Sequence, residues 1–184
     1  MGQIVSLTLP ILISGLALII AIKFKLLEFL DVPIDHGFLL NRKRLFGENK
    51  TYRGLAVFTI VAIFVCTLLQ NLYFNNFQEV IHPIFKNSPI LIGIVYALAY
   101  TFGELVNSAV KRQAHISPGK TTRSSFRSLQ RFLDLSDGIV MVAFVLTLFT
   151  LVTPGQAFLA SILGIGIHLG TDKLMQSLKL KQDF

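Results

Sequence analysis

The chain has 184 residues, of which 53% are hydrophobic and 15% charged, and it carries a formal net charge of +7. Its mean hydropathy of +0.65 excludes an ordinary soluble domain, in which about 25% of residues are charged. The single cysteine, Cys66, excludes a disulfide within the chain and argues against a thiolate zinc site. We therefore expect an all-α, polytopic integral membrane protein.

Five apolar segments divide the chain, at residues 4–22, 55–72, 90–109, 138–153 and 156–170. Most approach the roughly 17–25 residues that cross a bilayer, and the last two are short and joined by a turn at residues 153–156. The first lacks a basic leader and a clear cleavage site, so we expect it to be retained. The pattern predicts about five transmembrane helices in a single membrane-embedded domain, residues 1–184.

Basic residues alternate sharply between the connections. Seven lie in loop 23–54, one in loop 73–89, six in loop 110–137, none in the turn at 154–155, and three after residue 170. Because Lys and Arg favour the cytoplasmic face, five spans place the N-terminus outside and the C-terminus in the cytoplasm. We expect a multi-pass protein of the cytoplasmic (inner) membrane, with no nucleic-acid partner, whose site is carried by loops 23–54 and 110–137.

A polar streak ends the third apolar segment. Glu104, Asn107, Ser108 and Lys111 are spaced i, i+3, i+4 and i+7, so they share one face of a continuous helix, and Arg112 follows. Ionisable groups inside membrane segments are expensive and usually functional. We interpret this face as the floor of an active site, with Asn107 and Ser108 as substrate-binding residues.

The first basic loop ends in Lys50-Thr51-Tyr52-Arg53-Gly54. Lysine supplies a mobile ammonium, arginine a fixed fork for phosphate oxygens, Thr51 a hydroxyl donor, and Gly54 room for close backbone approach. The pattern favours an anion site, with Lys120 and Arg123 of the second basic loop as further substrate contacts. The alternative is an ordinary cytoplasmic cluster that meets anionic lipid headgroups.

Asp134 and Asp137 lie one helical turn apart where the fourth segment begins. Paired carboxylates there can hold a divalent cation whose other positions go to phosphate, although acidic caps of a helix N-terminus are the simpler alternative. Elsewhere, residues 23–30 suit a short interfacial helix, and residues 31–37 suit a solvated loop. We expect His82 to be an exposed loop residue and His168 to be a helix-packing or terminal residue.

These motifs together resemble the CDP-archaeol synthase branch of the CTP:phosphatidate cytidylyltransferase superfamily. The resemblance rests on residues 50–54, on residues 103–112, where Glu104 stands in place of the family's usual Asp, and on Asp134-x-x-Asp137. It implies transfer of CMP from CTP to a lipid phosphate with release of pyrophosphate, using Mg²⁺. Assembly as a homodimer is left open. By the same resemblance the metal ligands are Glu104, Asp134 and Asp137, and the catalytic phosphate contacts are Lys50, Arg53, Lys111 and Arg112.

Two alternatives remain open from the sequence. A CDP-alcohol phosphotransferase would open its motif as Asp134-x-x-Asp137-Gly138 does, but Met141 and Val142 stand where Ala-Arg is expected, and the later acidic residues are missing. A non-enzymatic transporter or scaffold would use the basic loops only to hold anionic lipid.

Overall fold

The computed structural model describes residues 1–117 and 127–177, with side chains up to residue 170, and is mainly helical. Lys120 and Arg123 lie outside the described residues. Two short 3₁₀ turns, η1 (Glu28–Leu30) and η2 (Pro83–Lys86), and a two-stranded hairpin, β1 (Leu39–Leu40) and β2 (Lys43–Arg44), lie between long helices. These helices are α1 (Gly2–Lys23), α2 (Tyr52–Phe74), α3 (Pro89–Gln113), α4 (Arg127–Leu148) and α5 (Pro154–Ser177). The expected helical fold with five long helices is confirmed, with the small hairpin as an addition.

The helices begin at residues that suit helix starts. The Thr51 hydroxyl accepts a hydrogen bond from the Gly54 amide (3.4 Å) and so caps α2. The Ser88 hydroxyl caps α3 by accepting from the Leu91 amide (3.4 Å), with Pro89 in the first helical position. α5 likewise begins at Pro154, directly after the expected turn.

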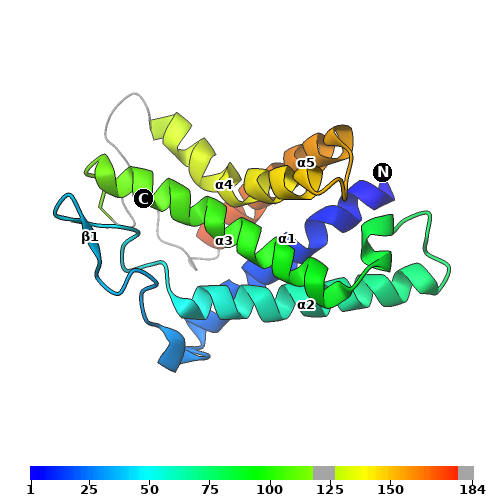
Figure 1. Ribbon diagram of the computed structural model, residues 1–184, viewed down its shortest axis with the longest axis horizontal. Coiled ribbons are helices and arrows are strands. Elements are labelled where there is room, and N and C mark those ends of the chain that lie inside the picture. Colours follow the sequence, from blue (N-terminus) through cyan, green and yellow to red (C-terminus); the bar gives the residue numbers. More distant parts are fainter. Residues whose placement is uncertain (118–126, 178–184) are drawn as a thin grey trace.

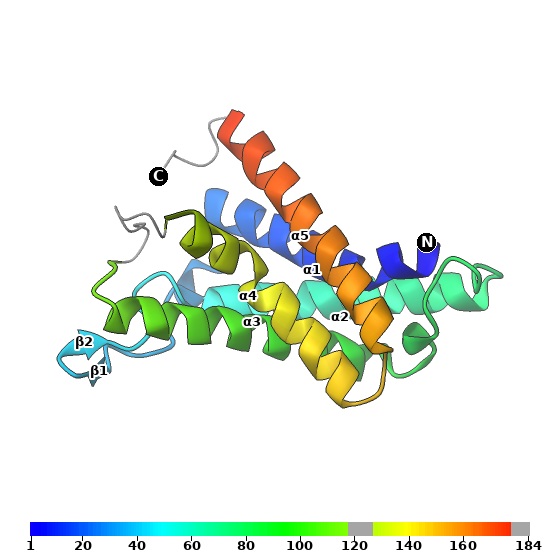
Figure 2. The same ribbon diagram turned by 90° about the horizontal axis from the view of Figure 1, so that it is seen from above.

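The five helices pack as a closed ring in which each contacts the next and α5 returns to α1. Figure 1 shows that the N-terminal ends of α2 and α4, the C-terminal end of α3 and the hairpin all lie at one end of the molecule. Figure 2 shows α4 and α5 passing across the layer formed by α2 and α3. The described residues singled out at the end of loop 23–54, in α3 and in α4 are therefore gathered at one end.

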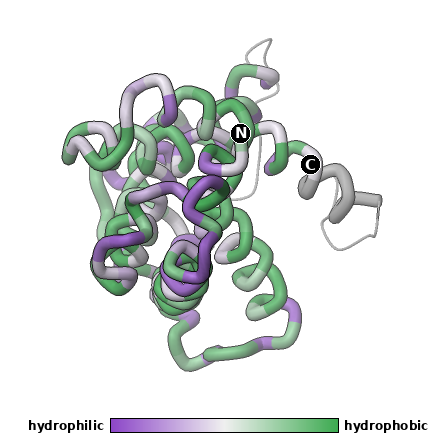
Figure 3. The backbone as a smooth tube through the Cα atoms, turned by 90° about the vertical axis from the view of Figure 1, so that its right-hand side faces the viewer, coloured by the Kyte–Doolittle hydropathy of each residue, from purple (hydrophilic) through white to green (hydrophobic). Residues whose placement is uncertain are grey.

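The outside of the bundle is strongly apolar. Large side chains such as Ile60, Phe64 and Phe144 are about 60% exposed, and the chain in Figure 3 is mostly coloured as hydrophobic. In the described part of the chain, α1, α2 and α3 are long and apolar enough to cross a membrane, whereas the apolar part of α5, Pro154–Gly170, is shorter. This is the surface of a membrane protein; the number of spans stays a prediction.

The helices expected at residues 138–153 and 23–30 differ most from the structure, and α3 and α5 also extend beyond the segments predicted for them. α4 runs over Arg127–Leu148, so it begins well before the apolar segment predicted at 138–153 and ends earlier. Helical hydrogen bonding does not depend on hydropathy, and the first turns of α4 mix charged with apolar residues. The interfacial helix expected at residues 23–30 is wrong except for η1, because Lys25 and Leu27 adopt positive φ angles (52° and 53°) that interrupt a right-handed helix.

Candidate active site

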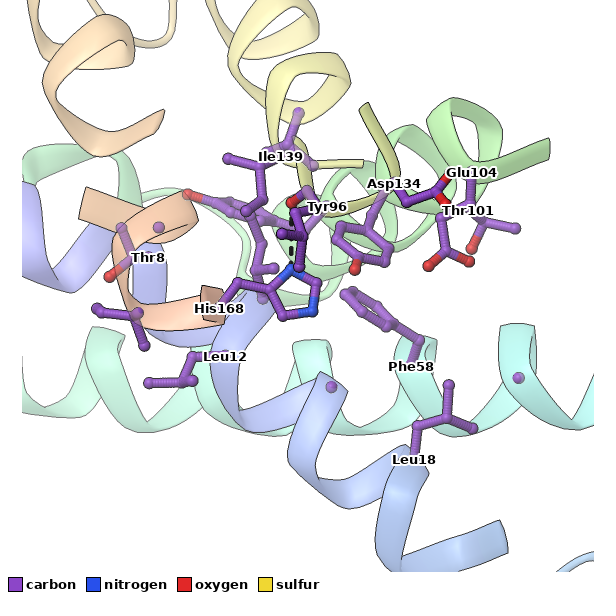
Figure 4. Close-up of a pocket in the computed structure, with 18 of the residues that line it drawn as sticks. Thr8, Leu12, Leu18, Phe58, Tyr96, Thr101, Glu104, Asp134, Ile139 and His168 are labelled. Atoms are coloured by element: carbon purple, nitrogen blue, oxygen red, sulfur yellow. Dashed lines mark hydrogen bonds between the residues drawn. The ribbon is translucent and has the colours of Figure 1, made fainter. Parts of the chain in front are cut away.

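A cavity of about 1150 Å³ lies between the helices. Its polar end is lined by Lys50, Glu104, Lys111 and Asp134, and its lining continues along α1 from Lys23 to Leu7. Figure 4 shows Glu104, Thr101 and Asp134 gathered on one side of this cavity, and Thr8 and Leu12 of α1 on the other. The cavity therefore joins a charged mouth to an apolar interior.

Asn107 links the two aspartates beside the charged mouth, and of these three residues only Asp134 lines the cavity. Its amide nitrogen donates to Asp134 Oδ1 and to Asp137 Oδ2, both at 2.7 Å. Lys111, one turn later on the same face of α3, donates to both Asp134 oxygens at 2.8 and 2.9 Å. The helix face predicted from the i, i+3, i+4, i+7 spacing thus meets the acidic turn of α4.

Two glycines allow α3 and α4 to approach this closely. A Cβ at Gly103 would collide with the carbonyl oxygen of Asp137, and a Cβ at Gly138 would lie 2.5 Å from the Tyr100 ring. Small residues at helix contacts of this kind are typical of membrane bundles. The glycines on either side of the interface therefore bring Asp137 against α3.

Lys50 connects the first basic loop to α3. Its ammonium lies 2.6 Å from Glu104 Oε2, and both side chains are partly exposed, at 25% and 31%. The loop is held in this register by an isolated antiparallel bridge between Pro33 and Thr51. Glu104 and Lys50, far apart in the sequence, are therefore direct partners.

Two further predicted site residues, Arg53 and Arg112, have structural partners, and a third, Ser108, is buried. Arg53 is 8% exposed and pairs with Asp31 at 3.0 Å. Arg112 donates through Nε to the Phe46 carbonyl (3.3 Å) and through a terminal nitrogen to the Ile116 carbonyl. Ser108 is buried (8% exposed) and is not among the cavity-lining residues. The catalytic role expected for Arg53 and Arg112, and the substrate-binding role expected for Ser108, stay predictions.

Several residues at or near the site were not identified from the sequence. Tyr100, Thr101 and His168 line the cavity, and His168 Nδ1 lies 3.1 Å from the carbonyl oxygen of Leu135, a residue between the two aspartates in the sequence of α4.

The expected solvated loop at 31–37 is wrong at Asp35, which is 6% exposed. His82 is also not exposed as predicted: it is buried (5%) and accepts from the Ile84 amide through Nδ1. Burial lowers the pKa of this imidazole.

The acidic residues of the mouth offer oxygen ligands to a cation. Within the described part of the chain, no three His, Cys, Asp or Glu side chains converge as a ready metal cluster. Asp134 and Asp137 nevertheless hydrogen-bond to one amide nitrogen, so their carboxylates lie side by side. Paired carboxylates fit a hard divalent cation that keeps further positions for phosphate and water.

A helical membrane protein with carboxylates and lysines at the mouth of an apolar cavity has the features of an enzyme that works on the phosphate of a membrane lipid. The family described as CarS-like, CDP-archaeol synthase, matches residues 4–184, and the chain belongs to this family. It is also 28% identical over 152 residues to a CDP-archaeol synthase of Pyrobaculum arsenaticum, covering 82% of this chain and 80% of that protein. No solved structure matches the chain.

Family membership defines the class of reaction. The chain is a nucleotidyltransferase, a CTP-dependent cytidylyltransferase that acts on a lipid phosphate, and enzymes of this kind generally use a divalent metal. This result favours cytidylyl transfer over the two alternatives left open by the sequence, a CDP-alcohol phosphotransferase and a non-enzymatic transporter or scaffold.

Proposed function

We propose that the protein transfers CMP from CTP to a membrane lipid phosphate, releasing pyrophosphate and leaving a CDP-activated lipid. The observation that carries this proposal is the joining of a charged mouth to an apolar cavity of about 1150 Å³. The mouth offers groups for phosphates, and the interior offers a surface for hydrocarbon. A water-soluble acceptor would have no use for the interior.

In this proposal the carboxylates bind the metal and the lysines bind phosphate. Asp134 and Asp137, with Glu104 across the mouth, would hold Mg²⁺, which when bound neutralises phosphate charge and polarises the α-phosphorus. Lys50 and Lys111 lie against these carboxylates at 2.6 and 2.8 Å, so their ammonium groups can reach phosphate oxygens beside them. They orient the triphosphate and stabilise the departing pyrophosphate.

The lipid phosphate is the nucleophile in this reaction. One of its oxygens attacks the α-phosphorus of CTP in line with the bond to the leaving pyrophosphate. Because this oxygen is already anionic near neutral pH, no side chain has to remove a proton. The mouth therefore has to position two anions and offset their repulsion, which fits its lysines.

We further propose five membrane spans, with the N-terminus outside, the C-terminus in the cytoplasm, and the protein in the inner membrane. The strong bias of Lys and Arg toward loops 23–54 and 110–137 supports this orientation. Both loops adjoin the end of the bundle where the charged mouth lies, so CTP would enter from the cytoplasm. Assembly as a homodimer stays open.

The reaction is tested with purified protein, radiolabelled CTP, Mg²⁺ and a panel of lipid phosphates. The panel contains phosphatidic acid, digeranylgeranylglyceryl phosphate with ether links, and a polyprenyl phosphate. We expect label in a lipid product that depends on one acceptor. Folded protein that labels no lipid with any acceptor contradicts the proposed function.

The apolar interior predicts a variant that affects the lipid but not the nucleotide. Gly15 lines the cavity, and a Cβ added there would have no atom within 4 Å, so Gly15→Leu places a side chain into the cavity without a backbone clash. We expect a rise in KM for the lipid phosphate of about tenfold, as binding surface is lost, and little change in KM for CTP.

Gly166→Leu is the matched control, because Gly166 also has open space around it but is not a lining residue. Both changes replace a helical glycine by a better helix former, so general effects on helix stability are shared. Equal KM values for lipid in the two variants would argue against the interior as the site of the hydrocarbon chains.

A further inference from the structure

Asp35 is a buried carboxylate in the loop between η1 and β1. Its side chain has no exposed surface, and it accepts four hydrogen bonds. Oδ1 accepts from the Gly37 amide (3.1 Å) and from the Arg44 guanidinium, and Oδ2 accepts from the Phe46 and Gly47 amides (3.0 Å each). A single carboxylate therefore closes the loop around the β1–β2 hairpin.

The loop that Asp35 closes leads directly to Lys50. On one side of Asp35, the Ile34 amide donates to the Lys50 carbonyl at 2.8 Å, and the Tyr52 amide donates to the Val32 carbonyl at 3.0 Å. On the other side, Asp35 binds the amides of Phe46 and Gly47, shortly before Lys50. The backbone of Lys50 is thus held by the segment before Asp35, which bonds to it directly, and by the segment at Phe46 and Gly47, which precedes it in the chain. Asp35 connects these two segments.

The same loop is attached to the end of α3. The Phe46 carbonyl accepts from Arg112 Nε (3.3 Å), while the Phe46 amide is bound to Asp35. Lys43 Nζ donates to the Gln113 carbonyl at 2.7 Å. The hairpin loop is consequently anchored to the helix that carries Glu104, and Asp35 lies at the centre of that connection.

Asp35 keeps its charge in this environment. Burial would raise the pKa of its carboxyl, but the hydrogen bonds from Arg44, Gly47, Gly37 and Phe46 outweigh burial and hold the pKa well below its usual range. Because the folded pKa is depressed, the stabilisation is present above the usual pKa and is lost as the pH falls toward the folded value. Asp35 therefore stays ionised, and able to accept these hydrogen bonds, throughout the neutral range.

We propose that Asp35 is a positioning residue for the cytidylyltransferase reaction. Asp35 holds residues 46–50 in place, so that the Lys50 ammonium lies beside Glu104 and can contact a substrate phosphate. Asp35 touches neither the acidic cluster of α4 nor the cavity, so it acts through Lys50. The kinetic test of this inference rests on the proposed function. A second test, by proteolysis and CTP binding, does not require turnover.

The kinetic test is a double-mutant cycle with Asp35→Asn and Lys50→Met. Asparagine keeps the shape of the side chain but places an amide among four donors. We expect Asp35→Asn to lower kcat/KM for CTP about tenfold in the native background and less than about twofold in the Lys50→Met background, because residues acting through one group are not additive. An equal loss in both backgrounds, or no loss in the native background, overturns the proposal.

Glu48→Gln is the matched control. Glu48 is the other partner of Arg44, at 3.4 Å, but its side chain is 75% exposed, so we expect activity within about twofold of the native value. If Asp35→Asn does not fold, Arg44→Met removes one of the four donors and enters the same cycle, with a smaller expected loss.

Limited trypsin digestion and binding of labelled CTP measure the loop without turnover. Asp35→Asn should be cut faster than the native protein after Arg42, Lys43 or Lys50, and should bind CTP more weakly, whereas Glu48→Gln should match the native protein in both. Unchanged cleavage and CTP affinity in Asp35→Asn overturn the proposal. A native protein that binds CTP but labels no lipid would instead contradict the proposed function alone.

Discussion

Replacing Asp137 with asparagine is expected to lower kcat by about 100-fold or more, the effect typical of losing a metal-ligand carboxylate. Asp137 accepts from the Asn107 amide and from the Gly138 amide at 2.7 Å each, so asparagine fits the same space but offers one oxygen where aspartate offers two. Glu104→Gln should act in the same direction, because it removes the carboxylate across the mouth. Turnover of labelled CTP at saturating lipid measures both.

Metal binding separates a chemical effect from a folding effect in these variants. Binding of Mn²⁺, followed by electron paramagnetic resonance in the presence of CTP, should weaken in both variants while thermal unfolding stays near the native value. Glu79→Gln is the control, since Glu79 is an exposed residue of the loop between α2 and η2. Full activity in both Asp137→Asn and Glu104→Gln would show that the proposed metal ligands are wrong.

The second large effect is expected at Gly103. A Cβ there would collide with the Asp137 carbonyl and lie 2.8 Å from Met141 Cβ, so Gly103→Ala must push α4 away from α3. Overpacking of this kind costs about 1–3 kcal/mol, and here it also displaces the acidic turn from Asn107 and Lys111. We expect a lower unfolding temperature in detergent together with a loss of most activity.

Gly155→Ala is the comparison for this substitution. Gly155 lies in the first turn of α5 with no atom within 4 Å of an added Cβ, so alanine there should leave unfolding temperature and activity nearly unchanged. If Gly103→Ala resembled Gly155→Ala, the close contact between α3 and α4 would not control the geometry of the mouth.

Apolar runs and helical spacing in the sequence predicted the helices and the polar face of α3. Apolar runs located the helices, because burial in a bilayer requires them, and the i, i+3, i+4, i+7 spacing on α3 correctly placed Asn107 and Lys111 on the face that meets Asp134. The early start of α4 at Arg127 was missed, since hydropathy does not register a helix with mixed polarity.

The tertiary contacts of the loops could not be predicted from the sequence. The sequence showed two acids at Asp31 and Asp35 but not that one pairs with Arg53 on α2 while the other is buried under the hairpin. The Asp35-His36-Gly37 order was a weak signal, because aspartate often accepts from an amide two residues on. The pairing of Lys50 with Glu104 depends on the path of the whole loop, which no spacing rule encodes.

The ion pairs Lys50–Glu104 and Lys111–Asp134 also bear on how the protein inserts and folds in the membrane. Carboxylates near a bilayer are costly without a counter-ion, and these two lysines provide one from within the chain. The protein can thus assemble its acidic mouth as it folds. Each lysine would then serve twice, as a resident counter-ion during biogenesis and as an exchangeable phosphate contact during turnover.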